Sequence, residues 1–190
     1  MTERISNFSV YILTYNDEKM ISRLLADLEI VEKVIVVDSY SSDATAQIVQ
    51  NHGRIFVQNK FYNQATQSNW VVENYFNEEE WVLRLDSDER VSERLLRELE
   101  TLAEKNDDRV GYIRREMYWM GKKLRFSSIR NHYIGRFYKP QNARYEEVTE
   151  EHLLHQCDRA MLRTCFYEDN IKNDISFFLM LILNIVFVLF

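Results

Sequence analysis

Two aspartates separated by one residue are the sharpest chemical feature of the sequence. Asp86 and Asp88 follow the largely apolar run 81–85, so both carboxylates can face one ion just beyond a buried strand. Hard cations such as Mg²⁺ and Mn²⁺ take oxygen ligands and bridge protein carboxylates to phosphate oxygens. The spacing therefore predicts a divalent cation that holds a phosphate-bearing ligand. The alternative is that Asp86 and Asp88 form a turn and cap the next helix.

Two further polar groups also stand where apolar runs end. The triplet Thr14, Tyr15 and Asn16 ends the first apolar run of the chain, and Asp38 ends the second. Ligands of doubly wound sheets bind at the carboxyl ends of the strands, so all three groups are candidates for one site. Asp38 can accept a hydrogen bond there from a base N–H or a ribose hydroxyl. The alternative is a loop aspartate that caps backbone amides.

The elements that must position these groups alternate along the first 105 residues. Apolar runs and helical stripes predict four strands (8–13, 34–37, 54–58 and 81–85) and four helices (17–28, 44–51, 66–76 and 92–105). This alternation is typical of an α/β fold with a doubly wound, mostly parallel sheet. We expect Asn16 to cap the first helix and Gly53 to end the second.

The pattern changes after Asn106. Two segments around Gly121 predict an antiparallel hairpin, and a further strand is expected close behind it (110–117, 123–126 and 134–139). This part of the chain is rich in Arg, Tyr and Trp, which indicates a lining for a polar ligand.

Other chemical groupings carry less information. Glu151 lies in an acidic stretch and can serve as a general base if burial raises its pKa, although the stretch also reads as a solvated acidic run. The spacing of His152, His155, Cys157 and Cys165 fits no standard zinc pattern. The sequence contains neither the glycine-rich dinucleotide fingerprint nor the P-loop motif, so neither kind of nucleotide binding is supported.

Composition excludes several classes of protein. The 190 residues include 46% hydrophobic residues but only 4 glycines and 1 proline, which favours a globular chain with a buried core. A net charge of −6 argues against a nucleic-acid binder. Two cysteines are too few for a disulfide scaffold, and the polar N-terminus does not resemble a signal peptide, so we expect a cytoplasmic protein.

The C-terminal tail, residues 175–190, is unusual because it carries no charge and is almost wholly apolar. A helix of this length spans about 24 Å, which is less than the ~30 Å hydrocarbon core of a membrane. The tail is therefore interpreted as a peripheral membrane anchor, as a buried core element, or as the product of a truncated or frame-shifted reading frame.

Three segments, 9–16, 36–45 and 83–89, resemble in this order the blocks of family 2 glycosyltransferases. Three later segments are similar to the bacterial branch near lipooligosaccharide and exopolysaccharide glucosyltransferases (111–125, 136–139 and 150–153). The resemblance covers about residues 5–170. It implies a GT-A fold, a Rossmann-like doubly wound mixed sheet with an antiparallel C-terminal part. Residues 1–105 would then bind the nucleotide sugar, and residues 106–170 would form the acceptor and catalytic half.

The resemblance also implies roles for single residues. Residues of three strand ends would bind the nucleotide sugar, with Asp38 on the uracil or ribose (Thr14, Tyr15, Asn16, Asp38 and Asp86). Asp86 and Asp88 would hold Mg²⁺ or Mn²⁺, with Asp88 favoured as the direct ligand. Glu151 would be the catalytic base of an inverting transfer of a hexose from a UDP-sugar to a surface glycan or a lipooligosaccharide. Such an enzyme would work in the cytoplasm, at the inner face of the membrane if the tail is an anchor.

The sequence departs from the family at three places. Ser68 stands where the family usually carries a basic residue, and Tyr40 stands where it carries glycine. Tyr40 therefore requires either a different turn or a left-handed backbone, which is unfavourable for a bulky residue. The apolar tail replaces a helical segment that often completes the acceptor site. These departures motivate an alternative function, a truncated or inactive protein that binds nucleotide without transfer.

Overall fold

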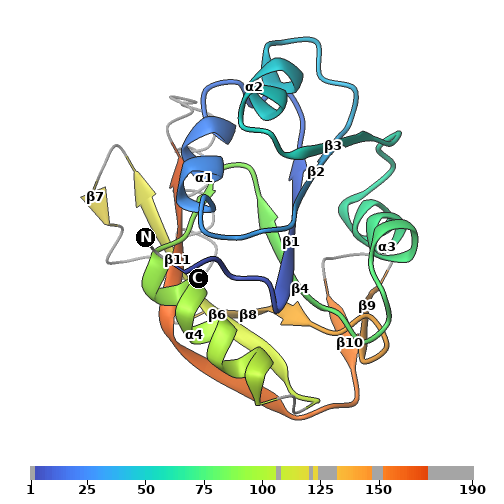
Figure 1. Ribbon diagram of the computed structural model, residues 1–190, viewed down its shortest axis with the longest axis vertical. Coiled ribbons are helices and arrows are strands. Elements are labelled where there is room, and N and C mark those ends of the chain that lie inside the picture. Colours follow the sequence, from blue (N-terminus) through green and yellow to red (C-terminus); the bar gives the residue numbers. More distant parts are fainter. Residues whose placement is uncertain (1–2, 106–107, 120–121, 124–131, 147–151, 171–190) are drawn as a thin grey trace, which may run out of the picture.

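The computed structural model describes residues 3–105, 108–119, 122–123, 132–146 and 152–170. A nine-stranded sheet forms the centre of the molecule, and helices cover both of its faces (Figure 1). The helices are α1 (Ile21–Asp27), α2 (Thr45–Asn51), α3 (Gln64–Tyr75) and α4 (Glu93–Glu104). The strands are β1 (Phe8–Thr14), β2 (Val34–Asp38), β3 (Ile55–Gln58), β4 (Trp81–Asp86), β5 (Glu89–Arg90), β6 (Val110–Trp119), β7 (Lys122–Lys123), β8 (Tyr133–Tyr138), β9 (Ala143–Tyr145), β10 (Leu153–His155) and β11 (Arg159–Asn170).

The strand order in the sheet is β3-β2-β1-β4-β8-β6-β11-β5, and β7 pairs with β6. The first four strands of this order run parallel, which confirms the predicted α/β sheet. Strand β8 runs antiparallel to β4, so the sheet is mixed and the strands after residue 106 extend it. The division into two halves at residue 105 stays a prediction. Strands β9 and β10 form a separate antiparallel pair.

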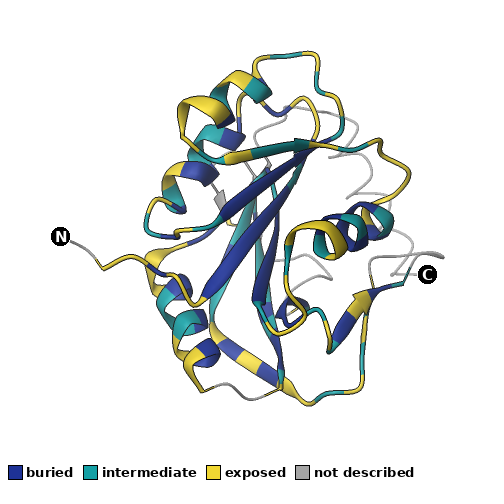
Figure 2. Ribbon diagram, turned by 45° about the vertical axis from the view of Figure 1, so that its right-hand side comes forward, coloured by how far each residue is buried: buried dark blue, intermediate teal, exposed yellow. Residues whose placement is uncertain are grey.

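The two faces of the sheet follow from the alternation of side chains along its strands. In β1, Val10 and Ile12 pack into the core formed with α1, α2 and α4, whereas Tyr11 packs on the opposite side with α3. Successive side chains of a strand point to opposite faces, so one apolar strand serves both layers. Figure 2 shows the buried central strands between α1, α2 and α4 on one side and α3 on the other.

Helix α4 shows how the sequence fixes one of these layers. Its leucines recur at helical spacing, and Leu95, Leu96 and Leu99 are fully buried. The side chain of Ser92 caps the helix, because its hydroxyl accepts a hydrogen bond from Leu95 N at 3.2 Å. A cap of this kind contributes about 1 kcal/mol. The predicted helix 92–105 is therefore confirmed to within one residue at each end.

The first helix is shorter than predicted, and the assignment of Asn16 as its N-cap was wrong. Helix α1 begins at Ile21, and Met20 is its N-cap residue. Asn16 instead has a left-handed backbone (φ 51°), and its side-chain oxygen accepts a hydrogen bond from Ser42 N at 2.8 Å. Asn tolerates this conformation better than most residues. Asn16 thus joins the loop after β1 to the loop after β2, and a turn delays the helix. Gly53, by contrast, ends α2 as predicted, with φ 65°.

The part of the chain after residue 106 matches the sequence analysis less closely. The predicted hairpin is present as β6 and the short β7, whereas residues 124–126 lie outside the described ranges. Strand β11 was not predicted, although it pairs with β6 along much of its length. Its register shifts between Met161 and Cys165, which interrupts the alternation of buried and exposed side chains that reveals a strand.

No helix within the described ranges is long and apolar enough to span a bilayer. The apolar tail, residues 175–190, lies outside these ranges. The interpretation of the tail as a membrane anchor therefore stays a prediction.

Candidate active site

A cavity of about 520 Å³ opens where β1 and β4 end side by side in the sheet. Its described lining combines residues of the loop after β1, the loops after β2 and β3, the start of α3 and the turn after β4 (Leu13, Thr14, Tyr15, Asp17, Ser39, Tyr40, Lys60, Phe61, Gln64, Gln67, Asp86, Ser87 and Asp88). Because β1 and β4 are parallel neighbours, their carboxyl ends meet at one edge of the sheet. The topology therefore brings the predicted strand-end groups together.

Four of the predicted site residues line this cavity: Thr14, Tyr15, Asp86 and Asp88. Asn16, in the loop after β1, and Asp38, the last residue of β2, lie beside it but are not among its lining residues. Glu151 lies outside the described residues, so its role stays a prediction.

Asp38 is fully buried and stabilises the loop beside the cavity. Its carboxylate accepts hydrogen bonds from Ser41 N at 2.9 Å, from the Ser41 hydroxyl, and from Gln58 Nε2 at 3.0 Å. These contacts correspond to the alternative of a loop aspartate that caps backbone amides. A contact between Asp38 and a base or ribose stays a prediction.

Asp17 is a lining residue that the sequence analysis missed. Its carboxylate accepts a hydrogen bond from the Ser87 hydroxyl in the turn between Asp86 and Asp88. Its backbone N–H donates to Thr45 Oγ1 at 3.0 Å, so Asp17 links the turn after β4 to the start of α2. Ser87 N also donates to Leu13 O at 3.2 Å. The sequence signal that could have identified Asp17 is its position directly after the triplet Thr14, Tyr15 and Asn16.

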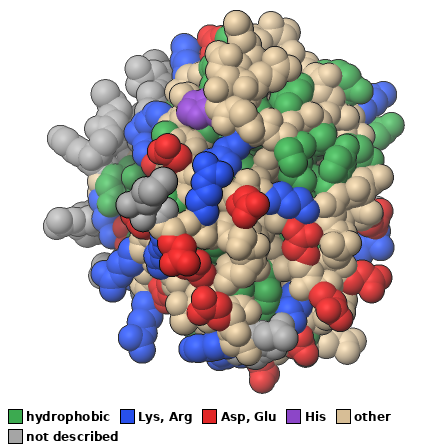
Figure 3. All heavy atoms as spheres, in the orientation of Figure 1, with side chains coloured by type: hydrophobic (Ala, Val, Ile, Leu, Met, Phe, Trp, Pro, Cys, Tyr) green, Lys and Arg blue, Asp and Glu red, His purple; other side chains and the backbone are tan. Residues whose placement is uncertain are grey.

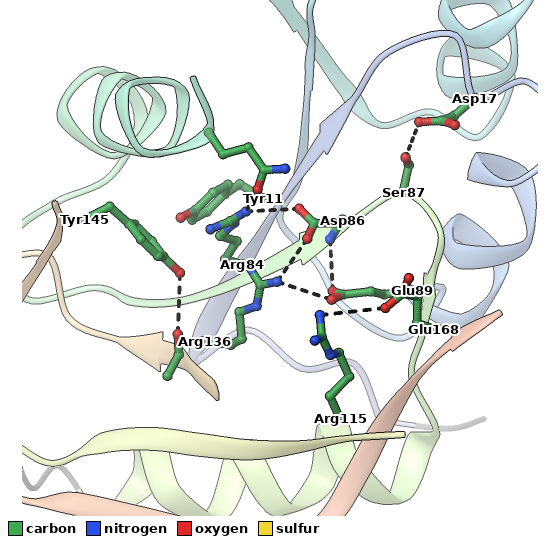
Figure 4. A network of polar contacts seen from close by, with 12 residues as sticks. Tyr11, Asp17, Arg84, Asp86, Ser87, Glu89, Arg115, Arg136, Tyr145 and Glu168 are labelled. Carbon is green, nitrogen blue, oxygen red and sulfur yellow. Dashed lines mark hydrogen bonds and ion pairs between the residues drawn. The ribbon is translucent and has the colours of Figure 1, made fainter. Parts of the chain in front are cut away.

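Two buried arginines hold the carboxylate of Asp86, one on each oxygen (Figure 4). Arg84 Nη2 lies 3.2 Å from Oδ1, and Arg136 Nη2 lies 2.9 Å from Oδ2. Burial opposes ionisation of Asp86, but the charges and hydrogen bonds of the two guanidinium groups outweigh it and hold its pKa below the ordinary value. Asp86 is therefore ionised at neutral pH, and its charge is compensated from within the protein.

The network continues behind Asp86 to a second acid, Glu89. One oxygen of Glu89 accepts a hydrogen bond from Asp86 N at 3.0 Å, and the other lies 3.3 Å from Arg136 Nη2. Burial raises the pKa of Glu89 to about 8, while the charge of Arg136 acts in the opposite direction. Arg136 thus bridges two carboxylates, Asp86 and Glu89. Neither Arg84 nor Arg136 was recognised as a partner of Asp86 in the sequence.

The turn after β4 fits a divalent cation that a ligand completes. Among the described residues, no group of three or more His, Cys, Asp or Glu is arranged to hold a metal ion. Mg²⁺ commonly takes only one or two protein carboxylates and fills its coordination with water and substrate phosphates. Asp88, half-buried at the cavity, fits this requirement. Arg84 and Arg136 contact both oxygens of Asp86, and the assignment of Asp88 as the direct ligand stays a prediction.

Tyr40 adopts the left-handed conformation that the sequence analysis gave as one of two options. Its φ is 62°, its side chain is 58% exposed, and it lines the cavity. This backbone conformation costs roughly 1–2 kcal/mol for a residue with a Cβ atom. The strain is therefore stored at the edge of the cavity.

Tyr40→Gly is expected to stabilise the protein. Glycine relieves the left-handed strain but adds entropy to the unfolded chain, so the net gain is about 0.5–1 kcal/mol, or roughly 2 °C in melting temperature. Thermal unfolding monitored by circular dichroism measures this. Tyr40→Ala is the matched control, because it removes the ring and keeps the strain. A melting temperature raised equally by both substitutions would contradict strain as the cause.

Exposed aromatic rings and one cation complete the wall of the cavity. Tyr15, Tyr40 and Phe61 are each at least half exposed, and Lys60 is the cation among the described lining residues. Hydrophobic side chains gather over the region of β3 and α3 in Figure 3. Ser68 is fully buried within α3 and does not line the cavity. Lys60 is therefore the positive charge among the described lining residues of this cavity.

The sequence of residues 9–168 matches glycosyl transferase family 2. Among curated proteins, the chain is 34% identical over 111 residues to an uncharacterised glycosyltransferase of Rickettsia conorii, covering 57% of this chain and 38% of that protein. It is 25% identical over 150 residues to the lipopolysaccharide core biosynthesis glycosyltransferase LpsC of Rhizobium meliloti, covering 76% of this chain and 55% of LpsC. The chain thus spans about a third to a half of the length of these relatives.

The fold is also similar to solved structures. Residues 1–349 of S. aureus TarS, in complex with UDP-GlcNAc, superpose with a TM-score of 0.62 at 18% identity. The match covers 88% of this chain and 59% of that chain. At this identity the likeness establishes the fold alone, which agrees with the predicted GT-A sheet. Together with the match over residues 9–168, these comparisons show that the chain belongs to glycosyltransferase family 2.

Proposed function

We propose that this chain binds a UDP-sugar in the cavity at the end of β1 and β4 and transfers the sugar, with inversion, to a glycan or lipid-linked acceptor. One observation carries the proposal. Asp86 and Asp88 at the end of β4 meet Thr14 and Tyr15 from the end of β1 around a single cavity with aromatic walls. Acidic groups suit a cation and its diphosphate, and exposed rings suit a base.

The aromatic rings of Tyr15, Tyr40 and Phe61 offer stacking surfaces for uracil, a contact that contributes about 1–3 kcal/mol per base. Lys60 can pair with a phosphate oxygen of the same ligand. In this arrangement Tyr40 has a role that explains why its strained backbone is tolerated.

Asp88, with Asp86 beside it, would hold Mg²⁺ or Mn²⁺. When bound, such a cation supplies positive charge that stabilises the departing diphosphate. The ion pairs of Asp86 with Arg84 and Arg136 keep its carboxylate ionised and fix its direction. The geometry of the turn after β4 is therefore set before the ligand arrives.

Glu151 is proposed as the catalytic base. It would take the proton of the acceptor hydroxyl while that oxygen attacks the anomeric carbon from the side opposite the UDP, which inverts the configuration. The name of LpsC, a lipopolysaccharide core enzyme, supports a surface glycan or lipooligosaccharide as the acceptor. A contact of residues 175–190 with the inner face of the cytoplasmic membrane is part of the same proposal.

The proposal is tested by UDP release from UDP-glucose, UDP-galactose and UDP-GlcNAc with Mn²⁺, using extracted lipooligosaccharide as acceptor. We expect acceptor-dependent release with one donor, and a melting temperature raised by roughly 5 °C at saturating UDP. A melting shift without turnover on any acceptor would favour the alternative, a protein that binds nucleotide without transfer. Neither a shift nor turnover would overturn both functions.

A further inference from the structure

A second cavity, of about 590 Å³, lies among β6, β8, β10 and the start of β11. Its described lining is Tyr112, Arg115, His132, Tyr133, Ile134, Gly135, Arg136, Glu146, His152, Leu153, Leu154, His155 and Arg159. Arg136 lines this cavity and lies 2.9 Å from Asp86, which lines the first cavity. The two cavities are therefore neighbours on either side of one buried ion pair.

The second cavity has the opposite charge to the first. Among its described lining residues, three arginines stand against the single carboxylate of Glu146, and three histidines add further donors. The first cavity has three aspartates against Lys60. Burial and, after it, the charge of Arg115 lower the pKa of His132, which agrees with a positive potential at this place. The ligand that suits the second cavity is therefore an anion.

Arg159 is the arginine best placed to meet such a ligand. Its side chain is exposed, and its guanidinium lies 4.7 Å from the centre of the Tyr112 ring. Within the described part of the chain, no carboxylate forms an ion pair with it. Arg115, by comparison, contacts Glu168 at 3.7 Å, and Arg136 is held by Asp86 and Glu89. Carboxylates thus compensate the positive charges of Arg115 and Arg136, whereas none of the described carboxylates forms an ion pair with Arg159.

The wall beneath Arg159 is rigid and partly aromatic. His155 Nδ1 donates to Cys157 O at 2.9 Å, so His155 Nε2 accepts the hydrogen bond of the Tyr112 hydroxyl at 2.8 Å. Gly135 gives the ring its space, since a Cβ atom there would lie 3.3 Å from Tyr112 Cζ and 3.1 Å from Leu153 Cδ2. The tyrosine ring supports the guanidinium of Arg159, whose N–H donors suit a ligand with a phosphate or carboxylate group.

We infer that the second cavity binds the acceptor through an anionic sugar, with Arg159 on its phosphate or carboxylate group and Tyr112 holding the Arg159 guanidinium in place. This inference rests on the proposed function, because it assigns the acceptor of that reaction. Arginine binds both kinds of anion through paired N–H donors. An anionic sugar in this cavity would lie beside the donor cavity, separated from it by the pair of Arg136 and Asp86.

The test measures the binding of small molecules to the full chain. The NMR signals of its four histidines report the binding. The probes are glucose 6-phosphate, glucuronate, glucose and inorganic phosphate. His132, His152 and His155 line the cavity and report binding there. His52 ends α2 and contacts Ser22 Oγ, so it is an internal control. We expect at least one anionic sugar to shift the three cavity histidines and to bind at least tenfold more tightly than glucose.

Arg159→Gln should weaken that binding to within about twofold of glucose, without changing the melting temperature, since Arg159 is exposed. Arg163→Gln is the matched control, because Arg163 is an exposed arginine on the same strand outside the cavity. Equal binding of glucose and both anionic sugars would overturn the inference. An equal loss of affinity for the anionic sugar in Arg159→Gln and Arg163→Gln would also overturn it. Inorganic phosphate that binds as tightly as glucose 6-phosphate would overturn it too, because the sugar ring would then contribute nothing to binding.

The two anionic probes distinguish a phosphorylated sugar from an acidic sugar. The melting shift with UDP in the same samples separates this inference from the proposed function. A shift with UDP and no response of the cavity histidines to either anionic sugar would overturn the inference alone. A response of the histidines without any UDP shift would overturn the donor site and leave the anionic-sugar site standing.

Discussion

Asp88→Asn is expected to lower UDP-sugar turnover at least 100-fold. Asparagine has nearly the same shape but lacks the negative charge that a divalent cation requires. Loss of stabilisation of the departing diphosphate by about 3 kcal/mol corresponds to a factor of roughly 100 in rate. Initial rates of UDP release at saturating donor and Mn²⁺ measure the effect.

The control for this substitution is Asp158→Asn, which removes an exposed carboxylate outside the donor cavity. Both variants should unfold within about 1 kcal/mol of the parent chain, because Asp158 is exposed, Asp88 is only half-buried, and asparagine keeps the shape of the side chain. Excess Mn²⁺ should restore part of the activity of Asp88→Asn and leave Asp158→Asn unchanged. Undiminished turnover in Asp88→Asn would contradict a cation bound by Asp88.

Arg136→Met is expected to have the largest effect on stability, a loss of about 3–5 kcal/mol in the free energy of unfolding. Arg136 is 2% exposed and bridges the carboxylates of Asp86 and Glu89. Methionine fills much of the same volume but leaves both acids without their shared guanidinium. Equilibrium unfolding in urea measures the loss, which corresponds to a melting temperature lower by roughly 10 °C.

The stability lost in Arg136→Met should be smaller at low pH than at high pH. The pKa of Glu89 is raised to about 8 in the folded protein from 4.5, so the folded state holds a proton that the unfolded state has released between these values. Protonated Glu89 carries no negative charge for the guanidinium to compensate. Arg136→Met should therefore cost less stability at pH 6 than at pH 9. The double substitution with Glu89→Gln should recover part of the loss. Equal losses at both pH values would contradict the role of Glu89.

The sequence alone predicts the parallel half of the fold because its signals are local. Apolar runs ending in polar residues predict β1, β2 and β4, and the topology rule for parallel strands then places Thr14, Tyr15, Asp86 and Asp88 together. The left-handed backbone of Tyr40 was also among the predicted options, because the family that the sequence resembles carries glycine at this position.

Other parts of the site depend on contacts that no local pattern carries. The partner of Asp86, Arg136, is 50 residues away in the chain and reaches it only because β8 pairs with β4. Asn16 looked like a helix cap, but its backbone turned left-handed to meet the loop after β2. The second cavity likewise draws its residues from four separate strands, so its positive charge becomes apparent only in the fold.

Calorimetric titration of the full chain with UDP tests whether a cation at Asp88 completes the UDP site. We expect binding at least 100-fold tighter in Mn²⁺ than in EDTA, because acidic residues alone repel the diphosphate. We also expect Asp88→Asn to abolish most of this difference. Equal affinity in Mn²⁺ and EDTA, or no UDP binding in either, would contradict a UDP site that depends on this cation.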